Sequence, residues 1–273
     1  MNTTKYILLI IVSIFFQSCE EVINVDLDTA PPRLVIDAAI NWQKGTIGNE
    51  QKIILSTTTG FYSNVIPKVS GANVAVKDTQ NFNYTFVEIP NTGEYVCDTF
   101  KPVLGETYTL TVTYEGETYI ATEIMQSVTP IEAITSNKEG GFSGKDYEIQ
   151  VSFQDPLDKN FYMAKFFPDI FKSPIYSIIK DEFTNGNLNS WQFSDEDLKQ
   201  GTKIAITHYG ISKSYYEYMN KIISISNSSG GGSPFQTPPA TVRGNIVNQT
   251  NINNYALGFF SLSEVDVRDY TIE

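Results

Sequence analysis

The chain contains only two cysteines and one histidine among its 273 residues. Zinc sites built from clusters of His and Cys are excluded by these counts. A Ser-His-Asp triad would have to use His208, and no G-x-S-x-G motif supplies a nucleophile for it. Cys19 is expected to carry lipid, as argued below, so Cys97 has no disulfide partner and is predicted to be a small buried residue of a strand. Stability must therefore come from the hydrophobic core.

Motifs for binding metals, phosphates or dinucleotides are also missing. Acidic residues cluster at Asp155 and Asp158 and again at 195–197, where they could hold calcium or act as a glycosidase pair. Neither cluster has the alternation and glycine of the D-x-[DN]-x-[DN]-G calcium loop, and turn and cap roles explain both. The glycine triplet at 230–232 lacks the Lys-Ser/Thr of a phosphate-binding loop. We therefore expect no catalytic residue, no metal and no cofactor.

Basic side chains are few. There are 19 Lys and Arg against 31 Asp and Glu, which gives a formal net charge of −12. Residues 1–18 contain one lysine and no acid, so the remaining chain is more negative still. A field of this sign repels nucleic acid and anionic lipid surfaces, and neither is an expected ligand. Membrane attachment must then come from covalently bound lipid rather than from a basic patch.

The apolar run at residues 6–16 is too short to span a bilayer as a helix, which needs about 20 residues. With Lys5 before it, the run is typical of a secretory signal peptide, which we predict over residues 1–18. Ser18 and Cys19 follow it closely. A small residue directly before a cysteine at this position resembles a lipobox. The sequence therefore predicts a lipoprotein whose mature chain begins at an acylated Cys19.

An acidic pair, Glu20 and Glu21, follows the cysteine directly. Such a pair resembles the surface-export signal of Bacteroidota lipoproteins. Charged residues also favour a solvated tether, which we predict over residues 19–32 and which ends in two prolines. We expect the folded body to face the cell exterior rather than the periplasm.

Strand-forming segments recur throughout the chain, and aromatic residues make up 13% of it. Apolar residues and threonines alternate over residues 108–114, which directs one face of that strand inward, and Glu115-Gly116 then predicts a two-residue hairpin turn. The patterns predict an all-β fold, with an immunoglobulin-like or transthyretin-like β-sandwich over residues 33–129 and a second β-rich, sandwich-like unit over 130–273. The expected strands cover residues 34–40, 53–55, 74–76, 84–86, 108–114, 119–124, 147–153, 161–167, 175–179 and 203–207.

Helical signals are confined to the second unit. Residues 181–201 are polar and rich in turn formers, and Ser194 followed by Asp197 predicts a capping box on one short helical turn. One longer helix is predicted near residues 212–226, with Ser212 as its N-cap. The apolar positions that recur on one face of this helix are Tyr215, Tyr218, Ile222 and Ile225.

Three aromatic residues are candidates for contact with a partner or ligand. Trp42 follows a predicted strand, Trp191 lies among polar residues, and Phe235 stands between prolines in the stretch SPFQTPP. Exposed Trp and Phe side chains can stack on sugar rings or anchor a protein partner. The alternative for each is a place in the hydrophobic core, and for Phe235 that alternative is favoured.

Short motifs occur in a fixed order along the chain. They are RLVID from Arg33, GANVAVKD from Gly71, GETYTLTV from Gly105, F-x-DP from Phe153, and SPFQTPP, RGNI and LGFF after the Tyr-rich helix. In this order they resemble a Bacteroidota lipoprotein family known as domain of unknown function 4249, over nearly the whole mature chain. The resemblance implies a lipid-anchored outer-membrane protein, often encoded beside a TonB-dependent receptor. It implies no established activity.

Two classes of function remain open. The first is a non-enzymatic accessory or cargo-capture lipoprotein that docks on a TonB-dependent outer-membrane transporter. The second is a stand-alone glycan-binding or adhesin-type β-sandwich on the cell surface. A gene for a large β-barrel receptor beside this one would favour the first class.

Replacing Cys19 by alanine tests the predicted lipid anchor. Because the thiol is the only atom in the lipobox-like segment that can carry the lipid, Cys19→Ala should abolish metabolic labelling with palmitate and leave an unprocessed or soluble form. Cys97→Ala is the matched control and should label as the wild type does. Labelling that persists in Cys19→Ala would contradict the prediction.

Overall fold

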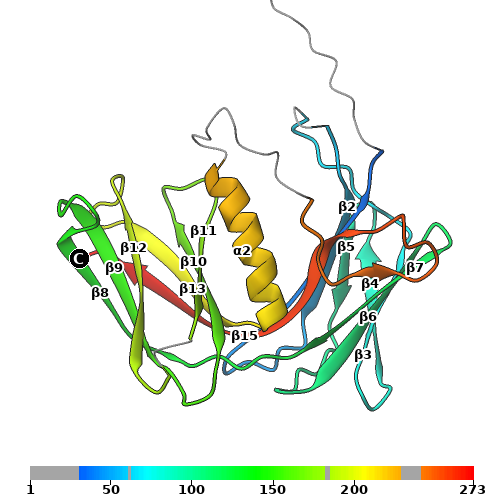
Figure 1. The fold of residues 1–273 in the computed structure, drawn as a ribbon, viewed down its shortest axis with the longest axis horizontal. Helices are drawn as coiled ribbons and strands as arrows, with labels where there is room; N and C mark the ends of the chain where they lie inside the picture. The colour runs from blue at the N-terminus through cyan, green and yellow to red at the C-terminus, as the bar shows by residue number, and fades with distance from the viewer. Residues whose placement is uncertain (1–30, 61–62, 182–184, 229–240) are drawn as a thin grey trace, which may run out of the picture. The chain divides into compact units, whose positions relative to one another are not determined.

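The computed structural model describes residues 31–60, 63–181, 185–228 and 241–273, and its longest strand, β15 (Leu257–Thr271), contributes to two hydrophobic cores. The first half of β15 pairs in parallel with β1 (Leu34–Gln43), and the second half pairs antiparallel with β13 (Lys203–Gly210). One continuous strand therefore runs from the first core to the second within the compact unit Pro32–Glu273 (Figure 1).

Strands account for most of the described body. Around the first core lie β1, β2 (Gln51–Thr57), β3 (Asn73–Lys77), β4 (Asn83–Ile89), β5 (Glu94–Cys97), β6 (Thr107–Tyr114), β7 (Glu117–Ile124) and β14 (Val247–Asn248). Around the second core lie β8 (Ile131–Gly140), β9 (Asp146–Gln154), β10 (Phe161–Pro168), β11 (Ile175–Lys180), β12 (Leu188–Asp195) and β13. Helix α2 (Lys213–Ser228) follows β13. The predicted all-β fold is confirmed.

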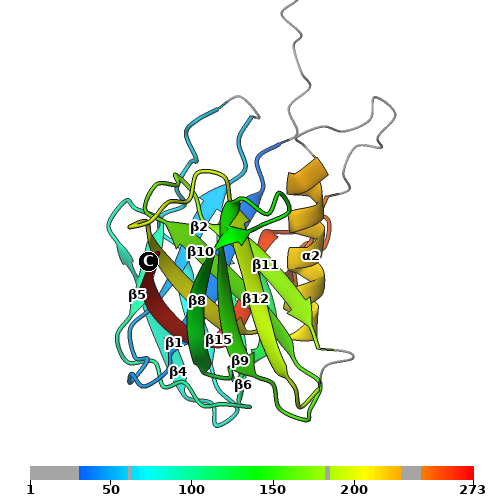
Figure 2. The same cartoon turned by 90° about the vertical axis from the view of Figure 1, so that its left-hand side faces the viewer.

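Two sheets contain all of these strands. The larger one has the order β11-β10-β13-β15-β1-β2-β5-β4-β3-β6-β7-β14, and β12, β9 and β8 form the other, which lies in front in Figure 2. The larger sheet turns at β4, because residues 83–86 of this strand pair with β3 whereas residues 87–89 pair with β5. We call its part from β11 to β4 the central sheet.

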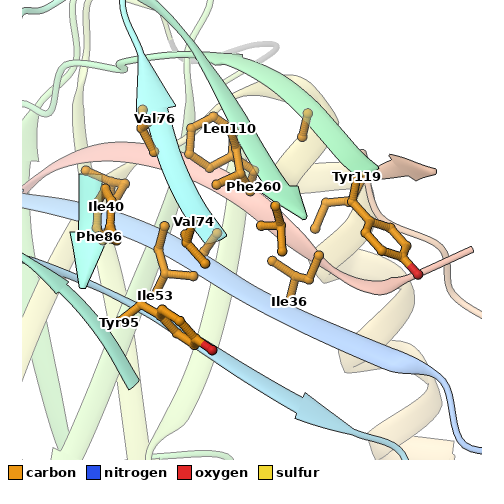
Figure 3. Packing of buried hydrophobic residues seen from close by; sticks show 14 of the residues in the cluster. Ile36, Ile40, Ile53, Val74, Val76, Phe86, Tyr95, Leu110, Tyr119 and Phe260 are labelled. Atoms are coloured by element: carbon orange, nitrogen blue, oxygen red, sulfur yellow. The ribbon is translucent and has the colours of Figure 1, made fainter. Parts of the chain in front are cut away.

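The first core lies between the central sheet and the strands that follow the turn at β4. Ile36 and Ile53 from the central sheet meet Val74 and Leu110 from β3 and β6, and all four are fully buried (Figure 3). These residues alternate with exposed or half-exposed ones along each strand, as expected for strands with one buried face. The first predicted sandwich is therefore confirmed as a two-layer structure.

The central sheet has both cores on one face and α2 on the other. Alternate residues of β15 point to opposite faces. Phe260 belongs to the first core and Tyr270 packs on the second, whereas Val265 and Val267 lie in a separate cluster with Tyr215 of α2. The helix therefore covers only the side of the central sheet that faces away from the two cores.

Helix α2 begins and packs largely as its sequence predicts. The Ser212 hydroxyl accepts a hydrogen bond from the Tyr215 backbone N–H at 3.2 Å, which confirms the predicted cap. The rings of Tyr215 and Tyr218 each lie 5.0 Å from the ring of Phe259 on β15. Ile222, expected on the same buried face, is exposed. In the described ranges no helix is both long enough and apolar enough to cross a membrane.

Strand β12 replaces the polar, turn-rich segment expected at 181–201. It pairs along its whole length with β9, and Trp191 and Phe193 point into the second core. The expected capping box at Ser194 is wrong, because Asp195 ends the strand and its Oδ1 accepts the Asp197 N–H at 2.9 Å. The period-two spacing of Trp191 and Phe193 was the signal for this strand.

The two cores do not divide the chain at residue 129. Ile246, Ala256, Phe260 and Leu262 come from the range expected for the second unit, yet they are buried in the first core. The cause is the parallel pairing of β15 with β1, which requires the chain to return across the whole molecule. The second unit thus contributes its last strand to both cores.

Two buried carboxylates on β15 hold the segment that joins the cores. Glu264 accepts hydrogen bonds from the Val128 N–H and from Lys44 Nζ, both at 3.0 Å. Asp266 accepts the Ile131 N–H at 2.8 Å. Bonds from charged acceptors to backbone donors are stronger than neutral ones. The passage from β7 to β8 is therefore tied to the middle of β15.

Glycine is required where β15 starts. Gly258 has a φ of +98°, and a Cβ there would overlap the carbonyl oxygen of Ile36 on β1. Gly258→Ala should therefore lower the free energy of unfolding by more than about 2 kcal/mol, which chemical denaturation would measure.

The matched control is Gly105→Ala. Gly105 has a similar φ of +77° but no atom within 4 Å of a Cβ, so only the backbone strain of roughly 1 kcal/mol is expected. If both variants lost the same free energy of unfolding, the close approach of β15 to β1 would not be the reason why residue 258 must be glycine.

Candidate functional site

The strongest candidate site is the part of the helix-bearing face of the central sheet that α2 does not cover. Along β1, β2, β5 and β4, residues that alternate with the buried ones point away from the first core. We call this surface the open face. Its residues are Asp37, Ala39, Asn41, Lys52, Ile54, Thr85, Val87, Glu94 and Val96.

Two adjoining hollows lie on the open face. One, of about 310 Å³, is lined by residues of β1 and β2 that include Asp37 and Lys52. The other, of about 510 Å³, extends over β5 and β4 to Val96 and Val87. Because Lys52 lines both, the hollows form one continuous surface from β1 to β4.

Asp37 lies at the end of the open face nearest to α2, beside several tyrosines. Burial by neighbouring groups raises the pKa of Asp37, and the positive charge of Lys52 partly opposes this rise. Burial is also the main cause that raises the pKa values of Tyr176, Tyr215 and Tyr218, and the negative charge of Asp37 raises them further. The carboxylate therefore lies close enough to act on the phenols of two elements, β11 and α2.

The other end of the open face is apolar. Val87 is 64% exposed, and Ile89 and Val96 are exposed beside it. Lys52 and Glu94 form an ion pair at 3.3 Å between this valine patch and Asp37. An exposed apolar patch next to fixed charges and tyrosines is the composition of a binding surface. Its residues offer contacts to a partner and no reactive pair of groups.

Two further hollows hold carboxylates that are already hydrogen-bonded. Near the start of α2, Glu123 accepts bonds from Ser212 and Ser214, each at 2.9 Å. Near β7, Glu117 accepts bonds from Tyr119 at 2.7 Å and Asn248 at 3.0 Å, and the bond from Tyr119 is the main cause that lowers its pKa. Both carboxylates serve to connect segments of the fold.

Trp191 and His208 are both buried in the second core. Trp191, expected as a contact residue, is only 2% exposed, and its Nε1 donates to His208 Nδ1 at 3.1 Å. Its polar sequence neighbours lie on the opposite face of β12, which is why the sequence suggested exposure. Burial lowers the pKa of His208 to about 3. The single histidine is thus a neutral core residue.

The remaining predicted site residues do not come together. Trp42 is half-buried and its Nε1 donates to the carbonyl oxygen of Thr46 at 2.8 Å, so it closes a local turn. Cys97 is buried in β5 as expected. Phe235, Cys19, Glu20 and Glu21 lie outside the described residues, and their predicted roles stay predictions.

The first expected acidic cluster does not form a common site. Asp155 is buried whereas Asp158 is exposed. The cluster at 195–197 serves the turn after β12, where Asp195 acts as the cap. Among the described residues, no three His, Cys, Asp or Glu side chains gather to hold a metal ion.

Three of the sequence motifs meet in space near the start of β1. The guanidinium groups of Arg33 and Arg243 lie 3.8 and 3.6 Å from the ring centre of Tyr255. Asn245 pairs with the backbone of Phe260, donating to its carbonyl oxygen at 2.8 Å and accepting its N–H at 2.9 Å. RLVID, RGNI and LGFF are therefore parts of one structural junction.

The open face itself was missed at the sequence level. In LVIDAAINWQ the residues between the buried Leu34, Ile36, Ala38 and Ile40 necessarily face outward, and Asp37 is one of them. That alternation was available in the sequence. The closeness of Asp37 to the tyrosines of β11 and α2 was not, because it depends on β15 lying between β1 and β13.

A comparison with protein families matches residues 20–269 to a model described as domain of unknown function DUF4249. A comparison with curated proteins gave no significant match.

Among solved structures, the chain is similar to a two-fibronectin-type-III segment of chicken tenascin, with 12% identity over 66% of this chain and 90% of that one and a TM-score of 0.22. It is also similar to a DUF4785 family protein from Legionella pneumophila, with 12% identity over 65% and 52% and a TM-score of 0.27. A third similar structure is that of the FN1–FN3 domains of chicken CNTN1, with 16% identity over 59% of this chain and 56% of that one and a TM-score of 0.23. This chain spans about half the length of the last two.

The buried His208 predicts an acid sensitivity of stability. The unfolded chain binds a proton at this residue below about pH 6.5, whereas the folded chain leaves it neutral down to about pH 3. Acidification through this window therefore favours unfolding, by about 2 kcal/mol at pH 5 relative to neutral pH.

His208→Gln removes the group that takes up a proton on unfolding, and its side-chain oxygen can still accept the hydrogen bond from Trp191 Nε1. Urea unfolding at pH 7.5 and pH 5 should show a smaller loss of stability in the variant than in the wild type. Equal losses in both proteins would mean that His208 is protonated in the folded state.

Proposed function

The chain belongs to the DUF4249 family, and from this premise we propose that it is a non-enzymatic, outer-membrane lipoprotein that binds a TonB-dependent transporter through its open face. Cys19 carries the lipid anchor, Glu20 and Glu21 direct the body to the cell exterior, and the protein helps the transporter capture its cargo. The observation that carries the proposal is the exposed surface of valines and fixed charges on the central sheet.

The chemistry of the open face favours a protein partner over a small ligand. The surface extends across four neighbouring strands, from Asp37 on β1 to Val87 on β4, and its two hollows are continuous through Lys52. Apolar side chains supply area that is dehydrated on binding, while Asp37 and Lys52 supply charges that fix orientation. A concave pocket closed on most sides would suit a small molecule better.

The open face is also built on a rigid support. β1 is paired on both sides, with β15 and with β2, and β15 is tied through Glu264 to the segment between the cores. A preformed surface loses little conformational entropy when it binds. The arrangement therefore suits a partner that recognises a fixed shape.

The alternative is a stand-alone glycan-binding protein of the cell surface. Tyr176, which is 38% exposed, and the carboxylate of Asp37 favour it, because sugars stack on aromatic rings and donate hydrogen bonds to carboxylates. In this case Tyr176 and the Asp37 end of the open face would bind the ligand, and the valine end would be dispensable. The two functions therefore require different parts of the same surface.

Val87→Lys tests the proposed function. Full-length tagged protein is purified from detergent-solubilised outer membranes, and the β-barrel proteins that copurify are identified by mass spectrometry. A charge placed in a dehydrated apolar interface should lower recovery of a transporter at least about tenfold, which corresponds to about 1.4 kcal/mol. The melting temperature should not change, because Val87 is exposed.

Val103→Lys is the matched control, since Val103 is also exposed but lies outside the open face. It should leave the recovery of the transporter unchanged. Tyr176→Ala distinguishes the proposed function from the glycan-binding alternative. The alternative is favoured if Tyr176→Ala loses glycan binding while Val87→Lys binds glycan as the wild type does. If no β-barrel copurifies with the wild type, the transporter partnership is wrong.

A further inference from the structure

Strand β11 is an edge of the central sheet that is open to further pairing. It pairs with β10 on one side, and on the other side no strand of the described ranges pairs with it (Figure 1). Its two faces are covered, because Ile178 packs in the cluster under α2 and Ile179 packs on the second core. A strand with covered faces and one open edge is extended by another strand in the same plane.

The backbone groups at this edge belong to Tyr176 and Ile178. The Asp181 N–H donates to the carbonyl oxygen of Asn160, towards β10, at 3.0 Å. Because the hydrogen-bonding direction alternates along a strand, the odd-numbered residues of β11 also bond towards β10, and the N–H and C=O groups of Tyr176 and Ile178 point outward. Within the described residues, these outward groups have no hydrogen-bond partner. The edge therefore presents a row of donors and acceptors to a further strand.

The other sheet edges in the described part of the chain carry features that oppose pairing, whereas β11 does not. β14 is only two residues long. β8 is interrupted by two register shifts and exposes Glu132, Lys138 and Glu139. β12 has polar residues along its outer face. β11 pairs regularly with β10, and residues 175–179, IYSII, contain no charge, proline or glycine. Charges, bulges and short lengths normally prevent edge pairing, so β11 is the edge suited to a partner strand.

The sequence of β11 is complementary to itself in an antiparallel arrangement. When Ser177 of one copy lies opposite Ser177 of another, Tyr176 of each copy lies opposite Ile178 of the other, and the outward N–H and C=O groups of these residues all pair. An aromatic ring then meets a branched side chain, which is a favourable cross-strand pair. Like charges do not face each other, because Lys180, the one charged residue of β11, falls at opposite ends of the two strands.

We propose that a second copy of this chain pairs with β11, so that two central sheets join edge to edge in a symmetric dimer. The contact is isologous and closes after two copies, because it uses the open edge of each copy. A contact through one short strand is small, so the dimer is reversible. The dimer does not depend on the proposed function, since the transporter contact uses β1 to β4 and leaves the edge of β11 accessible.

Sedimentation of the full-length protein in density-matched detergent tests the dimer. We expect mainly dimers at about 100 µM protein and mainly monomers at about 1 µM, as for a small reversible interface. Each copy has a formal net charge of −12, and salt screens the repulsion between copies, so 500 mM NaCl should preserve or strengthen the dimer. Monomers at both concentrations would overturn the proposal. So would a dimer that dissociates in high salt, because ion pairs on another surface would then hold it.

Two variants at Tyr176 separate backbone pairing from contact through the ring. Tyr176→Pro removes the outward N–H and keeps the bonds to β10, so the dissociation constant of the dimer should rise at least about tenfold. Tyr176→Ala keeps the N–H and should weaken the dimer less. Both should melt near the wild-type temperature, since the Tyr176 side chain is 38% exposed. Equal weakening in the two variants would contradict pairing through the backbone.

A cysteine at the symmetry axis tests the register without relying on the proline variant. Opposed residues that are not hydrogen-bonded to each other have Cα atoms about 4.5 Å apart, which a disulfide can bridge. Ser177→Cys should therefore form a covalent dimer under mild oxidation. Thr135→Cys, at an exposed position of the edge strand β8, is the control and should remain largely monomeric. If Ser177→Cys crosslinks no faster than Thr135→Cys, β11 is not the dimer contact and the proposal is wrong.

Discussion

The structure depends on the pairing of β15 with two different partners. Its first half lies in parallel beside β1 and its second half antiparallel beside β13, so the backbone hydrogen bonds of this one strand join two other strands of the larger sheet. A parallel pair needs a long crossover connection, and here that connection is nearly the whole chain. Neither core can be completed before the C-terminal residues have returned, which couples the two cores to one another.

Close approach of the backbone makes this pairing specific. Gly258 and Gly244 leave space that a side chain would fill, and Asn245 supplies hydrogen bonds to Phe260 in place of a neighbouring strand. Farther along β15, Glu264 and Asp266 bind the segment that leads from β7 to β8. These polar contacts are buried and therefore costly to break, so the relation between the two cores is fixed.

The same arrangement also supports the open face. The open face lies on the helix-bearing side of the central sheet, where β1 and β2 expose every second residue. A partner bound at the open face would contact strands that are held by β15.

Local patterns in the sequence determined the secondary structure, since a strand with one buried face must alternate and a helix must repeat every three to four residues. They identified most strands, the cap of α2 at Ser212 and the turn at Glu115-Gly116, where both residues have positive φ. Only the tertiary structure decided that Trp191 is buried and that Asp37 lies beside the tyrosines. Each of these depends on which distant strands pair, and pairing is set by the packing of whole sheets, for which a local period carries no information.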